Sequence, residues 1–131
     1  MPSALPITLR LYRRLSALAT PLYGAMISRR LKQGKEDPAR IGERRGIPTV
    51  DRPAGSLVWI HGASVGEVLA AAELIERLRA LGIRILLTSG TVTAAAMVER
   101  RFPNDVIHQY IPFDAPRFVE TFLKYWEPGL A

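Results

Sequence analysis

One stretch of this chain constrains the fold more than any other, because it runs from a short apolar strand through a loop of small residues into a helix. The predicted strand covers 56–60, the loop follows from His61 to Ser64, and the helix begins at Val65 with Glu67 in its first turn. This order is typical of a Rossmann-like parallel sheet, in which ligands bind beyond the carboxyl ends of the strands. The stretch therefore predicts a binding crevice at this loop.

Strands and helices continue to alternate after this stretch. Apolar residues recur at helical spacing through 65–81, and Gly82 follows as the expected helix terminator. The remaining elements are predicted as strands at 83–88 and 106–110 and as helices at 91–101 and 115–125. The second strand is apolar nearly throughout, which is typical of a strand buried on both faces of a parallel sheet. We therefore predict an α/β fold with a Rossmann-like parallel sheet.

Residues 1–34 differ in character from the rest of the chain. They are basic, and the uncharged run from Leu15 to Ser28 is shorter than the about 20 apolar residues that a membrane-spanning helix needs. We predict a basic helix that lies in a membrane interface, with packing against the protein itself as the alternative. A secretory signal peptide is disfavoured because Pro21 interrupts the apolar run and no A-x-A cleavage pattern follows.

Two further segments complete the predicted domain organisation. Residues 35–55 are rich in charge, glycine and proline, and they predict a linker with a short helix around 38–45. Residues 56–131 are predicted to form the Rossmann-like domain. Because the chain stops where a fourth strand is due, we expect this domain to be incomplete.

The charge of the chain bears on its partners. Lys and Arg number 18 against 12 Asp and Glu, a formal net charge of +6, and the excess lies between Arg10 and Arg45. The basic residues are interleaved with leucine and alanine, without aromatic stacking platforms or a recognisable nucleic-acid-binding module, so we expect no nucleic-acid partner. An anionic membrane surface suits this composition better.

Several metal and cofactor sites are disfavoured. The chain has no cysteine, and its two histidines lie far apart without an H-E-x-x-H motif, so no metal site is predicted. The loop glycines do not form the dinucleotide motif G-x-G-x-x-G, and no G-x-x-x-x-G-K-[ST] phosphate loop occurs. Nicotinamide cofactors and P-loop nucleotides are therefore not expected.

The residues alone leave two interpretations of Glu67 open. The spacing Ser64-x-x-Glu67 fits a capping box, in which Ser64 is the N-cap and Glu67 accepts a hydrogen bond from the Ser64 amide. The same carboxylate lies at the mouth of the predicted crevice, so a catalytic role is the second interpretation. His61, at the end of a strand, has a packing role as its alternative to a chemical one.

Four groups of residues carry a resemblance to a known family. The chain contains HGASVGEVLA at 61–70, preceded by RIGERRG at 40–46 and followed by LLTSGT at 86–91 and HQYIPFD at 108–114. In sequence and order these strings resemble the 3-deoxy-D-manno-octulosonic acid (Kdo) transferases, whose signature is H-x-x-S-x-G-E. The chain departs from that pattern at Gly62, where the family usually has a larger residue, and at Ser89-Gly90, where it tends to have threonines.

The resemblance implies the N-terminal, acceptor-binding half of a two-domain GT-B-type glycosyltransferase. Such an enzyme transfers Kdo from CMP-Kdo to a lipid A precursor with inversion, in lipopolysaccharide core synthesis at the cytoplasmic face of the bacterial inner membrane. Glu67 takes the role of general base. No cofactor is implied, because CMP-Kdo is the donor substrate. Since the donor belongs mainly to a C-terminal domain absent from this chain, the chain alone is predicted to be inactive.

The resemblance and the predicted sheet together suggest which residues bind substrate. The expected substrate contacts are His61, Ser64, Gly66, Thr88, Ser89 and Thr91 at the crevice, with Arg40 and Arg44 as donors to lipid A phosphates. Helix capping is the alternative for Ser89 and Thr91, and a solvated surface position is the alternative for the arginines. Two other functions also fit the chain: another two-domain sugar-nucleotide enzyme, and a non-catalytic lipid-surface or partner-binding α/β domain.

Overall fold

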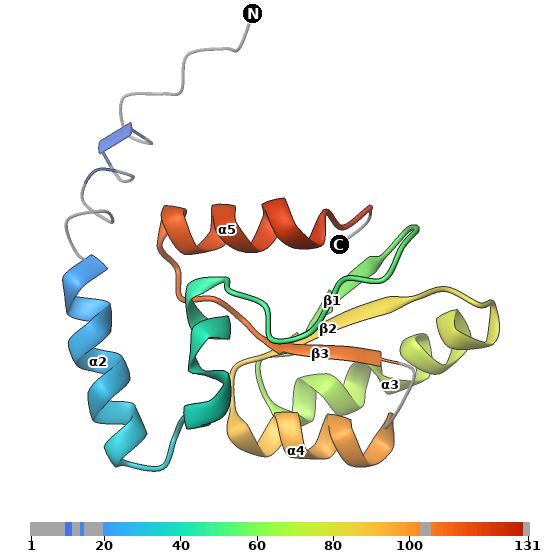
Figure 1. Ribbon diagram of the computed structural model, residues 1–131. Helices are drawn as coiled ribbons and strands as arrows, with labels where there is room; N and C mark the ends of the chain where they lie inside the picture. The colour runs from blue at the N-terminus through green and yellow to red at the C-terminus, as the bar shows by residue number, and fades with distance from the viewer. Residues whose placement is uncertain (1–9, 12–13, 15–19, 103–105, 130–131) are drawn as a thin grey trace, which may run out of the picture.

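The computed structural model describes residues 10–11, 14, 20–102 and 106–129 of the chain (Figure 1). Its elements are, in order, α2 (Thr20–Lys32), the 3-10 helix η1 (Pro38–Arg45), β1 (Val58–His61), α3 (Val65–Ala80), β2 (Ile85–Ser89), α4 (Val92–Arg101), β3 (Val106–Tyr110) and α5 (Pro116–Trp126). The predicted alternation of three strands with three helices is confirmed, and the fold class is α/β.

The three strands form one parallel sheet in the order β1-β2-β3. The central strand β2 pairs on both sides, so that Leu87 lies between Ile60 and His108. Every residue of β2 is buried, as its apolar sequence predicts. Because the strands are parallel, their carboxyl ends lie at one edge of the sheet, and a helix follows each of them. This topology is consistent with a Rossmann-like fold.

Helices cover both faces of the sheet (Figure 1). α3 and α4 pack on one face, where Ile85 and Leu87 belong to the hydrophobic core, whereas α5 packs on the other face against Leu86. This division follows from the two-residue period of a strand, which points successive side chains to opposite faces. Phe122 and Trp126 of α5 are fully buried there.

The strands differ from their predicted bounds at four ends. β1 begins two residues later than predicted. β1 and β2 each end one residue later than predicted, whereas β3 has the predicted bounds. β2 also begins later than predicted, because the amide of Ile83 donates to the carbonyl of Leu78 in the turn that ends α3. Gly82 in this turn has a φ of 76°, which glycine adopts without a steric penalty. Gly82 is thus confirmed as the residue that ends the helix.

The short helix predicted around 38–45 is present as η1, with those bounds. Asp37 caps its start, because its Oδ1 accepts a hydrogen bond from the amide of Ala39 at 3.0 Å. Gly46 ends it with a φ of 79°, and a Cβ at this position would lie 2.3 Å from the carbonyl oxygen of Phe118 in α5. This part of the predicted linker is therefore closely packed against the domain.

The predicted interface segment 1–34 is described mainly through α2; residues 1–9, 12–13 and 15–19 lie outside the described part of the chain. One side of α2 packs on the domain, where Ile27 is buried and the Tyr23 ring stacks on Phe113 with centroids 5.5 Å apart. Leu22 is 70% exposed. Of the described helices, none has both the length and the apolar character needed to cross a bilayer.

Candidate active site

The residues predicted to line the crevice lie where the three strands end. The last residues of β1, β2 and β3 are His61, Ser89 and Tyr110. Two backbone hydrogen bonds join the loop after β1 to the end of β2: the Gly62 amide donates to the Thr88 carbonyl at 3.0 Å, and the Gly90 amide donates to the Ala63 carbonyl at 3.1 Å. The loop before α3 is thus fixed to its neighbouring strand.

Glu67 lies in the first turn of α3, and its side chain is exposed. Its Oε2 accepts a hydrogen bond from the amide of Ala63. Ser64 occupies the N-cap position without a side-chain cap hydrogen bond, so the predicted capping box is replaced by this bond one residue earlier. Among the described residues, Oε1 of Glu67 has no hydrogen-bond partner, so this oxygen can accept from a bound ligand.

His61 is held by a buried hydroxyl group. Its Nδ1 lies 2.8 Å from Oγ1 of Thr88, and the indole nitrogen of Trp59 donates to the same oxygen at 2.9 Å. The prediction placed the Thr88 hydroxyl in the crevice, but Thr88 belongs to β2 and is fully buried. Thr88 is therefore placed to orient the exposed ring of His61 and not to contact a substrate directly.

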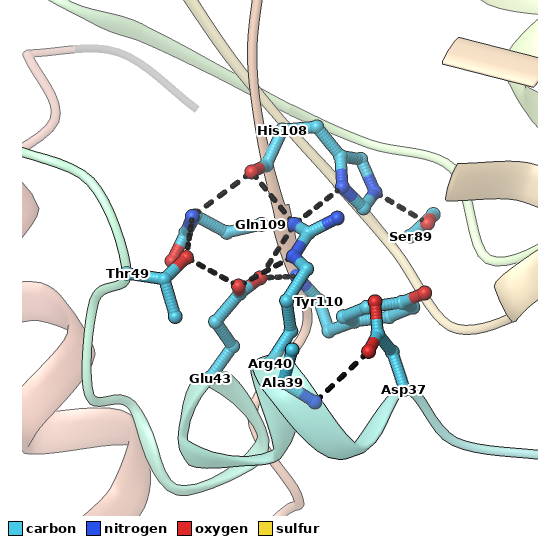
Figure 2. A network of polar contacts seen from close by, with 9 residues as sticks. All are labelled: Asp37, Ala39, Arg40, Glu43, Thr49, Ser89, His108, Gln109 and Tyr110. Atoms are coloured by element: carbon cyan, nitrogen blue, oxygen red, sulfur yellow. Dashed lines mark hydrogen bonds and ion pairs between the residues drawn. The ribbon is translucent and has the colours of Figure 1, made fainter. Parts of the chain in front are cut away.

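Ser89 is also buried, and it takes part in a polar network shown in Figure 2. Its Oγ lies 2.7 Å from Nε2 of His108, and Nη2 of Arg40 donates to Nδ1 of the same ring at 2.9 Å. Because a guanidinium group only donates, the ring is neutral and carries its proton on Nε2, which donates to Ser89. Burial, and then the charge of Arg40, lower the pKa of His108 to about 3. The Ser89 hydroxyl is committed to this internal network.

Arg40 also binds the buried carboxylate of Glu43 through two hydrogen bonds, from Nε at 2.6 Å and from Nη2 at 2.7 Å. That carboxylate accepts two more, from the Thr49 hydroxyl and from the amide of Tyr110 at 2.8 Å. The pair thereby joins η1 to β3 (Figure 2). Nε and Nη2 of Arg40 are used within the fold, and Nη1 alone has no hydrogen-bond partner among the described residues.

Arg44 is buried, and its guanidinium group binds within the protein. Its Nε and Nη2 donate to Glu36 at 3.2 and 3.1 Å, Nη2 also donates to the carbonyl of Gly90 at 3.2 Å, and Nη1 donates to the carbonyl of Ile111 at 2.8 Å. The residue is only 4% exposed, and its guanidinium lies over the Phe113 ring. All three nitrogens of Arg44 thus have acceptors inside the protein, so the alternative of a solvated surface position is wrong, and its contact with a phosphate stays a prediction.

The remaining predicted contacts divide between capping and the surface. Oγ1 of Thr91 accepts a hydrogen bond from the amide of Ala94 at 3.1 Å, which confirms the capping alternative for Thr91. Ser64 and Gly66 are exposed next to Glu67. The structure thus gathers four of the predicted residues at one exposed site and turns three inward: the exposed ones are His61, Ser64, Gly66 and Glu67, and the inward ones are Thr88, Ser89 and Arg44.

A hollow of about 370 Å³ lies elsewhere on the surface, between η1, α4 and β3. Its polar lining includes Arg40, Thr49, His108 and Gln109, and Glu67 is not part of it. No group of histidine and acidic side chains that could hold a metal ion occurs within the described ranges. The hollow and the candidate catalytic carboxylate are thus separate features.

Sequence reasoning missed the buried acids Glu36 and Glu43 and the half-buried His108. The two acids lie in a strongly basic segment. One local pattern could have indicated an ion pair, because Arg40 and Glu43 are three residues apart and so are neighbours on a helix. Their other partners lie far away in sequence, because His108 is 68 positions from Arg40. No local pattern could identify those contacts.

Comparison with known proteins gives one consistent family. A family model described as 3-deoxy-D-manno-octulosonic-acid transferase (kdotransferase) matches residues 39–131. A protein of Arabidopsis thaliana named probable 3-deoxy-D-manno-octulosonic acid transferase, mitochondrial, is 38% identical over 92% of this chain and 27% of its own length. The 3-deoxy-D-manno-octulosonic acid transferase of Rickettsia bellii is 38% identical over 93% of this chain and 30% of its own length.

A more distant relative gives the same name. The 3-deoxy-D-manno-octulosonic acid transferase of Haemophilus influenzae is 34% identical over 70% of this chain and 22% of its own length. The chain thus spans less than a third of the length of each of these three relatives. No solved structure matches the chain.

Proposed function

This chain belongs to the 3-deoxy-D-manno-octulosonic acid transferase family, and from that premise we propose that it is the acceptor-binding, N-terminal half of a two-domain GT-B-type glycosyltransferase. Its role is to bind a lipid A precursor and to activate one hydroxyl group of that acceptor toward CMP-Kdo. The donor is held mainly by a second domain. The reaction takes place at the cytoplasmic face of the bacterial inner membrane, and it serves lipopolysaccharide core synthesis.

The position of Glu67 is the observation that carries this proposal. Its carboxylate is exposed at the edge of the sheet where ligands of Rossmann-like folds bind, and Oε2 is held by the amide of Ala63. One oxygen is fixed by the backbone, and the other is open. A general base needs both features, because its proton-accepting atom must face the substrate in a defined orientation.

The proposed chemistry is a single displacement with inversion. Oε1 of Glu67 takes the proton from a glucosamine hydroxyl group of the acceptor as the hydroxyl oxygen attacks the anomeric carbon of Kdo. The bond between this carbon and the phosphate oxygen of CMP breaks, and CMP leaves with the electron pair. The imidazole of His61, oriented by Thr88, and the hydroxyl of Ser64 lie at the same exposed surface and are suited to bind hydroxyl groups of the acceptor.

A substitution at Glu67 tests the catalytic role in a full-length transferase that contains this chain. Glu67→Gln retains an oxygen that can accept from the Ala63 amide but removes the base, so we expect turnover of CMP-Kdo to fall by ~10²- to 10⁴-fold. Glu73→Gln is the matched control, because Glu73 is another exposed glutamate of α3 and, among the described residues, pairs only with the exposed Arg77. Near-normal turnover of Glu67→Gln would remove the support for the proposal.

One observation favours the non-catalytic alternative, because the bond from the Ala63 amide to Glu67 ties the loop before α3 to the first turn of that helix. On that reading the carboxylate only stabilises α3, and Glu67→Gln leaves turnover intact. The same experiment therefore decides between a catalytic and a structural glutamate. For the chain of 131 residues by itself, we expect no transfer of Kdo, and measurable turnover by that purified chain would contradict the assignment of the donor site to a second domain.

A further inference from the structure

A continuous series of hydrogen bonds connects the buried Arg44 to Glu67. Nη2 of Arg44 donates to the carbonyl of Gly90 at 3.2 Å, the amide of Gly90 donates to the carbonyl of Ala63 at 3.1 Å, and the amide of Ala63 donates to Oε2 of Glu67. Gly90 and Ala63 each take part in two of these bonds, one through the carbonyl and one through the amide. The series crosses from η1 to the loop after β2 and then to the loop before α3.

Arg44 is well placed to fix this series. Its guanidinium is buried, it donates to the carboxylate of Glu36, and its central carbon lies 4.6 Å from the centroid of the Phe113 ring. Nη1 also binds the carbonyl of Ile111, in the loop after β3. One planar fork therefore holds the loops that follow two neighbouring strands, which the single ammonium group of lysine cannot do.

The loops in this series approach one another closely. A Cβ added at Gly90 would lie 3.1 Å from the carbonyl oxygen of Ala63, and a Cβ added at Gly62 would lie 2.8 Å from a methyl carbon of Val68. Gly62 and the glycine of Ser89-Gly90, the two places where the chain departs from the family pattern, thus fall at these contacts. Small residues here let the loop before α3 lie directly against the end of β2, within reach of the series that starts at Arg44.

We infer that Arg44 is a positioning residue for Glu67, which it acts on through the backbone of Gly90 and Ala63. This inference rests on the proposed catalytic role of Glu67. In this role Arg44 acts without touching substrate. It sets where the Ala63 amide lies, and that amide fixes one oxygen of the carboxylate, so the other oxygen meets the acceptor in a constant orientation.

The test uses steady-state kinetics of a full-length transferase that contains this chain. We expect Arg44→Lys to lower kcat by about 10- to 100-fold, the range that a small misplacement of a catalytic group produces, while KM for the acceptor changes by less than about twofold. In a Glu67→Gln background the same substitution should lower kcat no further, because both changes act on one group. Faster hydrogen exchange of the Ala63 amide is the matching structural readout.

A matched control separates positioning from general stability. Arg52 also holds backbone carbonyls, those of Trp126 at 2.6 Å and Gly55 at 3.0 Å, but it shares a hollow with Ile85 and Val106, where β2 and β3 begin. Arg52→Lys should therefore lower stability without lowering kcat. An equal fall in kcat for both arginine variants would overturn the inference.

A second variant covers the case in which Arg44→Lys does not fold. Gly90→Ala leaves Arg44 and Glu36 in place but presses on the Ala63 carbonyl, so it should also lower kcat with little change in KM. Suppose that Glu67→Gln is inactive but a folded Gly90→Ala or Arg44→Lys enzyme has an unchanged kcat. That result would refute the positioning role of Arg44 and leave the catalytic role of Glu67 standing. If Glu67→Gln is active, the proposed function fails instead, and the Ala63 exchange rate still reports whether Arg44 holds this loop.

Discussion

Nδ1 of His108 accepts a hydrogen bond from Nη2 of Arg40 at 2.9 Å, and burial together with the charge of Arg40 lowers the pKa of this half-buried imidazole to about 3, so the ring stays neutral. The ring completes a network that joins η1 to β2 and β3, because Ser89 binds His108 and Glu43 binds Arg40. The polar interior of this domain thus depends on the protonation state of one histidine.

Acid should destabilise the domain through His108. Its pKa is about 3 when folded, against about 6.5 for an unperturbed histidine, so the unfolded state binds more protons between these pH values. The free energy of unfolding should therefore fall as the pH drops from 6.5 to 3, by up to about 1.4 kcal/mol per pH unit from this group. Urea unfolding of wild type and His108→Gln at several pH values isolates this contribution, and identical pH slopes would contradict it.

Gly46 should be the least replaceable glycine at a left-handed position. A Cβ there would lie 2.3 Å from the carbonyl oxygen of Phe118, so we expect Gly46→Ala to cost more than about 3 kcal/mol in the free energy of unfolding. Gly34 has a similar φ of 70° with nothing within 4 Å of an added Cβ, and Gly34→Ala should cost only the conformational penalty of about 1 kcal/mol. Chemical denaturation measures both, and equal losses would refute the close packing of η1 on α5.

The two N-cap residues should differ in their contribution to stability. Thr91 accepts a hydrogen bond from the Ala94 amide, so Thr91→Ala should cost about 1 kcal/mol. Ser64 occupies the same position before α3 without such a bond, and Ser64→Ala should change stability by less than about 0.5 kcal/mol. Thermal unfolding of the two variants provides the measurement. A larger loss at Ser64 would show that the predicted capping box does form.

Binding to an anionic membrane surface should depend on the end of α2. Arg29, Lys32 and Lys35 are exposed there, so vesicles containing an anionic lipid should bind the chain at low salt and release it as salt rises. The double variant Arg29→Gln with Lys32→Gln should bind less tightly than Arg117→Gln with Lys124→Gln, which removes the same charge from α5. If binding changes neither with salt nor with the substitutions in α2, the role of α2 is only to pack on the domain.

Local sequence patterns correctly predicted the elements and placed their ends within two residues. The apolar run of β2, the glycine that ends α3 and the proline that starts α5 each act on neighbouring residues, so a window of sequence contains the whole cause. The same holds for Thr91, whose capping partner is three residues away. The exact start of β2 was wrong, because it depends on a turn bond between Ile83 and Leu78 that competes with strand pairing.

The sequence by itself determined the α/β alternation, the position of Glu67 in the first turn of a helix and the family to which the chain is similar, because apolar spacing, caps and short motifs are local. Only the tertiary structure decided which polar side chains remain available at the surface. The sequence predicted that Arg44 and Ser89 bind a substrate. In the structure Arg44 binds Ile111, in the loop after β3, and Ser89 binds His108, in β3 itself, and both partners lie far along the chain. The order of strands in the sheet brings these groups together, and burial then satisfies their hydrogen bonds inside the protein.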